Sequence, residues 1–188
     1  MVLLLQSLSV SAQNATVYTT TGNSSQLLDE TSVAVANTSM TSGALVLKPT
    51  EKIQRMDGFG FAITYSSCFN LMKMSETDRL AFLKKTYSET EGYGVSYARI
   101  SIGCSDFSST EYTLCDATGL EHFRLYTDEL DYVIPVLKEI LAINPKVKII
   151  AAPWTCPTWM KVENITTKTP HTSWTDGHIN PDYYQDYA

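Results

Sequence analysis

The chain has 188 residues, 44% of them hydrophobic and 18% charged, so it has enough apolar side chains for a folded core and differs from disordered or collagen-like chains. Its 14 basic and 20 acidic residues give a formal net charge of −6. A nucleic-acid-binding protein needs a dense positive face, so we expect no nucleic-acid partner. The length is also below the roughly 250 residues of a complete (β/α)8 barrel.

The first twelve residues read like the end of a secretory leader. An apolar run over residues 2–5 is followed by small residues, with Val10 and Ala12 at the spacing of a signal-peptidase site. The run lacks a basic start and is too short to span a bilayer, so a flexible apolar N-terminus is the alternative. We interpret residues 1–12 as a signal-peptide remnant and expect a secreted, periplasmic or cell-surface protein, or a lysosomal one in a eukaryote.

A tract rich in Thr, Ser and Asn extends over residues 13–52 and contains almost no aromatic residues. Its loose alternation, for example over residues 16–19 and 33–36, is typical of short antiparallel strands. We therefore predict strands of a β-rich side domain here and a domain boundary near residue 53.

From residue 53 to residue 188, apolar strand-like runs alternate with helix-length amphipathic segments, which is typical of βα units around a parallel sheet. Strands are expected over residues 56–63, 95–102 and 147–152. Helices are expected to begin at Ser75, Thr127 and Pro181. Ser75 and Asp78 have the spacing of a capping box, and Pro135 is expected to kink the second helix or to split off a short first segment.

Long loops follow the second and third expected strands, where a parallel barrel builds its active site. Asp106 and Phe107 lie in the first of these loops, and Trp154 and Trp159 lie in the second. A carboxylate accepts hydroxyl hydrogen bonds and an aromatic face stacks on the C–H surface of a sugar, so these residues suit a carbohydrate. A loop-capping role for Asp106 and core packing for the tryptophans are the alternatives.

Arg99 lies within the second apolar strand, where a buried arginine needs a partner, so we expect it to meet a carboxylate inside a barrel. The chain also has four cysteines that are too scattered for a disulfide framework and include no CxxC pair that would support a zinc site. We expect buried or half-buried free thiols and no metal. These cysteines are Cys68, Cys104, Cys115 and Cys156.

Three ordered segments together carry a family resemblance. They are residues 58–60 (GFG), residues 99–108 (RISIGCSDFS) and residues 152–161 (APWTCPTWMK). The chain from about residue 54 onward resembles glycoside hydrolase family 30, which includes glucosylceramidases. The resemblance implies the N-terminal part of a (β/α)8 TIM barrel, with about three βα units and truncated before the fourth strand, preceded by strands of a β-rich side domain.

The resemblance also implies roles for individual residues. Asp106 and Trp154 match residues that hydrogen-bond the hydroxyls of the glucose in the −1 subsite, and Phe107 lines that pocket. Arg99 matches an arginine that supports the active-site carboxylates. Family members are retaining β-glycosidases that use two glutamates on later barrel strands. No segment here matches either glutamate motif, so the resemblance implies no catalytic residue in this chain, no cofactor and no turnover by the chain alone.

The expected activity is that of a glucosylceramidase-like hydrolase, which cleaves a β-glucosyl linkage in a glycolipid or an oligosaccharide by double displacement. A related β-1,6-glucanase or β-xylosidase is the nearest alternative, because the same scaffold serves related sugars. A truncated, non-catalytic remnant that binds sugar weakly is the other alternative.

Overall fold

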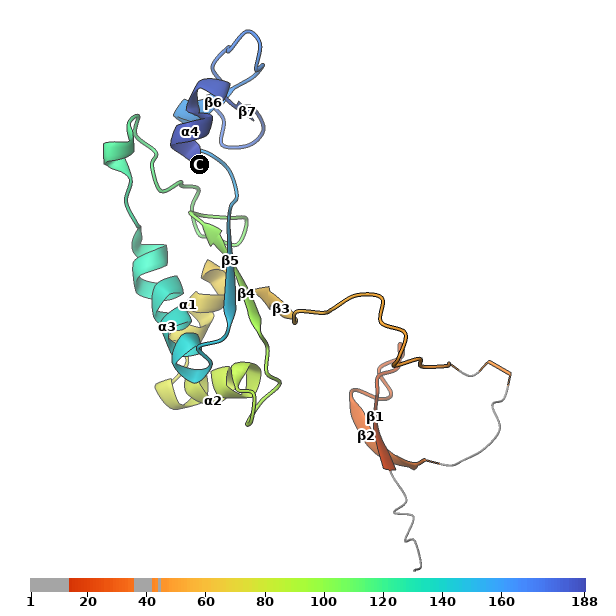
Figure 1. Ribbon diagram of the computed structural model, residues 1–188. Coiled ribbons are helices and arrows are strands. Elements are labelled where there is room, and N and C mark those ends of the chain that lie inside the picture. Colours follow the sequence, from red (N-terminus) through yellow and green to blue (C-terminus); the bar gives the residue numbers. More distant parts are fainter. Residues whose placement is uncertain (1–13, 36–41, 44) are drawn as a thin grey trace, which may run out of the picture. The chain divides into compact units, whose positions relative to one another are not determined.

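A computed structural model describes residues 14–35, 42–43 and 45–188 (Figure 1). The chain divides into two compact units, Met1–Gln54 and Arg55–Ala188. The leader expected over residues 1–12 lies outside the described residues. Within the described ranges, no helix combines the length and apolar character needed to cross a membrane.

The described part of the first unit contains a two-stranded antiparallel hairpin. Strand β1 (Asn14–Thr19) pairs with β2 (Asp29–Ala34) along their whole lengths. The turn between them is closed by Thr21, whose carbonyl accepts from the Ser24 amide and whose hydroxyl accepts from the Gln26 amide. The antiparallel strands expected from the Thr- and Ser-rich tract are therefore present.

The second unit is built on a parallel sheet of three strands in the order β3-β4-β5. These are β3 (Gly60–Ala62), β4 (Tyr97–Ile102) and β5 (Lys148–Pro153). The first strand is shorter than predicted. Its backbone approaches β4 so closely that a Cβ on Gly60 would lie 2.2 Å from the carbonyl oxygen of Tyr97, which makes glycine necessary there.

Two helices connect β3 to β4, of which the sequence predicted the second. Helix α2 (Glu76–Tyr87) begins at the expected cap, where the Ser75 hydroxyl accepts from the Asp78 amide at 3.1 Å. Helix α1 (Tyr65–Lys73) was not predicted, and the side chain of Thr64 at its start forms no capping hydrogen bond.

The connection from β4 to β5 confirms the effect of Pro135. A π-helical segment, η2 (Asp128–Val133), precedes α3 (Ile134–Ile143), and the proline stands in the first turn of α3 because it has no N–H to donate to the preceding turn. Helices α1, α2 and α3 lie along one face of the sheet (Figure 1). They bury a common apolar cluster against it, formed by Ile63, Cys68, Leu71, Leu83, Tyr87, Ala98, Val136, Leu137, Ile140 and Val147.

Short elements follow the carboxyl ends of β4 and β5. The β4 loop contains the 3-10 turn η1 (Leu120–His122). The segment after β5 contains η3 (Thr158–Met160), the antiparallel pair β6 (Lys161–Val162) and β7 (His178–Ile179), η4 (Pro181–Tyr183) and α4 (Tyr184–Tyr187). The helical start predicted near Pro181 is confirmed.

Candidate sugar-binding site

The candidate site lies at the carboxyl ends of two neighbouring strands. Ile102 of β4 and Pro153 of β5 are partners in the parallel register. The loops that begin at Gly103 and Trp154 therefore leave the sheet next to each other. Gly103 is buried with a φ of +75°, a left-handed conformation that lets the chain turn sharply away from the strand.

Asp106 and Phe107 lie at the tip of a tight turn in the first of these loops. The turn is closed by the Ser108 amide donating to the Ser105 carbonyl at 3.0 Å and by the Ser105 amide donating to the Ser108 hydroxyl at 3.1 Å. The Ser105 hydroxyl in turn accepts from the Phe107 amide at 3.2 Å. The two serines therefore cap the turn, and within the described residues the exposed Asp106 carboxylate makes no hydrogen bond or ion pair, so it is free to accept hydrogen bonds.

A residue of helix α1, which follows β3, also holds this turn. The amide of Ser66 donates to the Phe107 carbonyl at 3.2 Å, and the Ser66 hydroxyl donates to the same oxygen. Ser66 lies in the first turn of α1, so the loop after β3 is joined to the loop after β4. Sequence reasoning missed Ser66, Ser105 and Ser108 as supporting residues, although the two serines that flank Asp106 and Phe107 were a usable turn signal.

The two tryptophans after β5 have different environments. The Trp159 indole donates to the Cys115 carbonyl at 2.8 Å, and its ring packs edge-on against Tyr183 at 5.2 Å between centroids. Core packing, the alternative considered for both residues, therefore describes Trp159. Trp154 follows the end of β5 directly and is 48% exposed, which leaves its ring available for stacking.

Arg99 lies on an uncovered face of the sheet. It lies on the sheet face opposite the helices, where its register partners are Ala62 and Ile150. It is exposed, and it forms no ion pair with any carboxylate of the described residues. Three strands leave this face of the sheet uncovered, so water can solvate the guanidinium. The expected pairing of Arg99 with a carboxylate inside a barrel stays a prediction.

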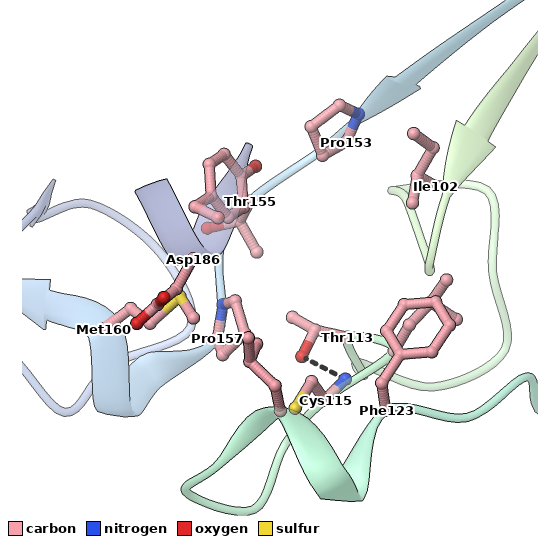
Figure 2. Close-up of a pocket in the computed structure, with 12 residues that line it drawn as sticks. Ile102, Thr113, Cys115, Phe123, Pro153, Thr155, Pro157, Met160 and Asp186 are labelled. Carbon is pink, nitrogen blue, oxygen red and sulfur yellow. Dashed lines mark hydrogen bonds between the residues drawn. The ribbon is translucent and has the colours of Figure 1, made fainter. Parts of the chain in front are cut away.

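A mainly apolar cavity of about 170 Å³ lies between the two loops and α4 (Figure 2). On its wall the Cys115 amide donates to the Thr113 hydroxyl at 3.3 Å. Asp186 is the charged side chain of its lining, which sequence reasoning did not single out. The lining residues are Ile102, Thr113, Leu114, Cys115, Leu120, Phe123, Pro153, Thr155, Pro157, Met160, Asp186 and Tyr187.

The far end of the β4 loop is joined to η2 through Glu129. This carboxylate accepts from the Tyr112 hydroxyl at 2.6 Å and from the Tyr126 amide at 3.0 Å. Burial and the bond to Glu129 raise the pKa of Tyr112, so its hydroxyl stays protonated and donates. Burial, together with the neighbouring Glu129 charge, raises the pKa of Asp128.

All four cysteines are free and buried, as the sequence predicted. Burial raises the pKa of the Cys68 thiol to about 12, so this group is not a reactive thiolate. Over the residues that the structure describes, no group of three or more His, Cys, Asp or Glu side chains is arranged to hold a metal ion.

The chain is similar to known glycosidases in sequence and in structure. It is 31% identical to mouse lysosomal acid glucosylceramidase over 67% of the chain and 25% of that protein, and 31% identical to an endo-1,6-β-D-glucanase of Trichoderma harzianum over 67% of the chain and 27% of that enzyme. The solved structure of the endo-β1,6-glucanase BT3312 is 55% identical over 92% of the chain, with a TM-score of 0.78.

The chain spans a quarter to about a third of the curated relatives that it matches and 37% of the solved glucanase. Its residues 56–188, more than half of its length, match the description "Glycosyl hydrolase family 30 TIM-barrel domain". This range contains β3, β4 and β5 with their helices, which form the parallel α/β arrangement of part of such a barrel. The chain therefore belongs to glycosyl hydrolase family 30.

Proposed function

We propose that this chain supplies the glucose-binding wall of a retaining β-glucoside hydrolase whose substrate is a β-1,6-linked glucan. The observation that carries the proposal is the exposure of Asp106, Phe107 and Trp154 after neighbouring parallel strands. Parallel barrels bind their substrates at this end of the strands.

Each of the three side chains has a defined task in the proposal. The Asp106 carboxylate accepts hydrogen bonds from glucose hydroxyls, and the exposed rings of Phe107 and Trp154 present faces to the C–H surface of the sugar. The Ser105–Ser108 turn and the Ser66 contact hold Asp106 before substrate arrives. A hydroxyl contact that is preorganised in this way strengthens as the oxocarbenium-like transition state forms.

The bond-breaking step needs two carboxyl groups about 5–5.5 Å apart, one as nucleophile and one as acid and base. We assign neither role to a residue of this chain. The chain spans about a third of its relatives' length, and we propose that the pair is contributed by the barrel strands that follow this segment in those relatives. We call the segment together with those strands the complete enzyme, and we expect no turnover by the 188-residue chain alone.

The relatives give unequal support to the two candidate substrates. The 55% identity to an endo-β1,6-glucanase exceeds the 31% identity to mouse lysosomal acid glucosylceramidase, and this difference favours a β-1,6-glucan. Hydrolysis of a glucosylceramide remains the second candidate, on the strength of the mouse relative.

Initial rates of the complete enzyme on β-1,6-gluco-oligosaccharides, glucosylceramide and an aryl β-glucoside test the proposal. A kcat/KM at least tenfold higher on the β-1,6-linked substrate supports it, whereas a preference for glucosylceramide assigns the second candidate. Absence of activity on all three would contradict the proposal, as would turnover by the purified 188-residue chain.

Replacement of Asp106 tests the sugar-binding assignment itself. Asp106→Ala removes a contact that strengthens in the transition state, so we expect kcat/KM on the aryl β-glucoside to fall by about 100-fold or more, which corresponds to roughly 3 kcal/mol. Glu111→Ala is the matched control, because Glu111 is an exposed carboxylate in the same loop. Equal rates for the two variants would refute the role of Asp106.

A further inference from the structure

A buried lysine lies next to the candidate site without a carboxylate partner. Lys161 is 4% exposed and forms no ion pair with a described residue. Its ammonium donates instead to the backbone carbonyls of Ser173, Trp174 and Asp176, at 3.4 Å for Ser173 and 3.1 Å for Asp176. Burial of a charge is costly unless its donors are satisfied, so these three carbonyls are what hold the ammonium in place.

The position of Lys161 in the fold makes it an anchor for the segment that follows. Strand β6 pairs with β7 on one side, and on the other side the Lys161 carbonyl accepts from the His171 amide at 3.1 Å. The backbone at Lys161 is therefore held between two neighbouring stretches of chain. Its side chain reaches from this fixed position into the loop over residues 173–176.

That loop has a conformation that needs external support. Asp176 and Gly177 both have positive φ values, +57° and +73°, and a Cβ on Gly177 would lie 2.7 Å from the His171 ring. A left-handed conformation is unfavourable for a non-glycine residue such as Asp176 and persists where the surrounding contacts determine it. The three hydrogen bonds from the Lys161 ammonium to the loop carbonyls, which we call the lysine clamp, supply these contacts.

The clamped loop presents Trp174 to the neighbouring loop. The Trp174 side chain packs against the buried cluster of Cys104, Tyr112 and Leu114. Within this cluster the Tyr112 amide donates to the Cys104 sulfur at 3.1 Å, and Cys104 directly precedes the turn that carries Asp106. Contacts therefore run without interruption from Lys161 through Trp174 to the base of this turn.

We propose that Lys161 is a positioning residue, which holds the Asp106 carboxylate in its sugar-binding position by clamping the loop that seats Trp174. This inference rests on the proposed function, because it requires Asp106 to contact the sugar. Lys161 itself touches no substrate, and it acts through the Trp174 cluster.

A double-mutant cycle in the complete enzyme tests the proposal. Lys161→Met removes the clamp, and we expect kcat/KM on an aryl β-glucoside to fall by about 10- to 100-fold, mainly through kcat. In the Asp106→Ala background the same substitution is expected to lower kcat/KM by less than about threefold, because the residue through which it acts is absent. Lys168→Met, which removes an exposed ion pair with Asp182 in the same segment, is the matched control.

A second variant keeps the test decisive if Lys161→Met does not fold. Trp174→Leu leaves the lysine in place and removes the indole that packs against the Cys104, Tyr112 and Leu114 cluster, so it is expected to show the same loss and the same coupling to Asp106. Equal fold losses in the presence and absence of Asp106, for whichever variant folds, would overturn the inference. An inactive wild-type enzyme refutes the proposed function instead, so the two failures are distinguishable.

Discussion

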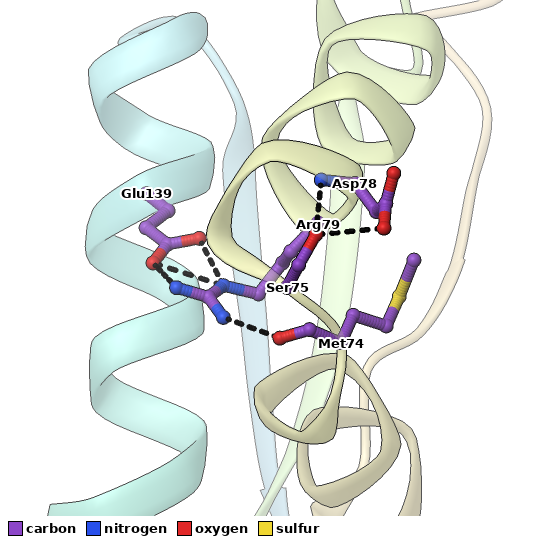
Figure 3. A network of polar contacts seen from close by, with 5 residues as sticks. All are labelled: Met74, Ser75, Asp78, Arg79 and Glu139. Carbon is purple, nitrogen blue, oxygen red and sulfur yellow. Dashed lines mark hydrogen bonds and ion pairs between the residues drawn. The ribbon is translucent and has the colours of Figure 1, made fainter.

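One ion pair joins the two long helices that cover the sheet, and its removal gives a measurable loss of stability. The Arg79 guanidinium on α2 binds the Glu139 carboxylate on α3 through both Nε and Nη2 at 2.9 Å, and its Nη1 approaches the Met74 carbonyl at 3.5 Å (Figure 3). The two side chains are 11% and 31% exposed. The pair is therefore bidentate and largely shielded from water.

The expected loss follows from this geometry. Two unit charges about 4 Å apart attract by ~4 kcal/mol at an effective dielectric constant of about 20. Removing one partner of a buried pair costs about 3–5 kcal/mol, and the partial exposure of Glu139 reduces that value. We therefore expect Arg79→Met to lower the free energy of unfolding by ~2–3 kcal/mol, and the double variant Arg79→Met with Glu139→Met to lose less than the sum of the single losses.

Equilibrium urea unfolding of the four proteins of this cycle gives the coupling energy directly. The matched control is Lys146→Met, which breaks a 3.0 Å ion pair with Glu89 whose side chains are 75% and 53% exposed, and for which we expect at most about 0.5 kcal/mol. A coupling energy no larger than that of the exposed pair would refute the argument that burial makes the Arg79 contact strong.

Three further predictions concern single groups. Because burial raises the pKa of Cys68 to about 12, its contribution to stability is complete below the ordinary thiol pKa near 9 and is lost as the pH rises toward 12, so Cys68→Ala should flatten the alkaline part of a stability–pH curve. Burial and the Glu129 charge raise the pKa of Asp128 above its ordinary value of 3.8. Its contribution to stability is therefore complete below about pH 4 and is lost as the pH rises through the raised pKa. Asp128→Asn should raise Tm at pH 7 and give no gain below about pH 4. Trp154→Ala should change the unfolding free energy by less than ~0.5 kcal/mol while abolishing the fluorescence change on adding glucose oligomers.

Elements whose determinants lie within a few residues could be predicted from the sequence. The start of α2 has its capping signal in Ser75 and Asp78, and the break before α3 has its signal in Pro135. Helix α1 lacked such a local signal, since Thr64 does not cap it with its side chain. Its aromatic rings instead pack against η2, where the ring centroids of Tyr65 and Phe69 each lie 5.4 Å from that of Tyr132. This contact joins residues more than sixty positions apart, so the periodicity of the sequence cannot reveal it.

The same distinction separates the parts of the candidate site. Asp106 and Trp154 could be singled out because carboxylates and aromatic rings at strand ends have a recognisable chemistry. The environment of Arg99 could not be predicted, because it depends on whether other strands cover its face of the sheet. In the structure, Arg99 is exposed beside Ala62 and Ile150.

The two side chains proposed to hold the Asp106 turn in place, those of Ser66 and Lys161, donate their hydrogen bonds to backbone carbonyls. Ser66 donates to the carbonyl of Phe107, and Lys161 donates to the carbonyls of three loop residues. A carbonyl is present in every residue, so a sequence pattern gives no sign of which one a distant side chain binds. Substitutions at the positioning residues should therefore alter catalysis although nothing in their local sequence identifies them, and the Lys161→Met and Asp106→Ala cycle measures that effect directly.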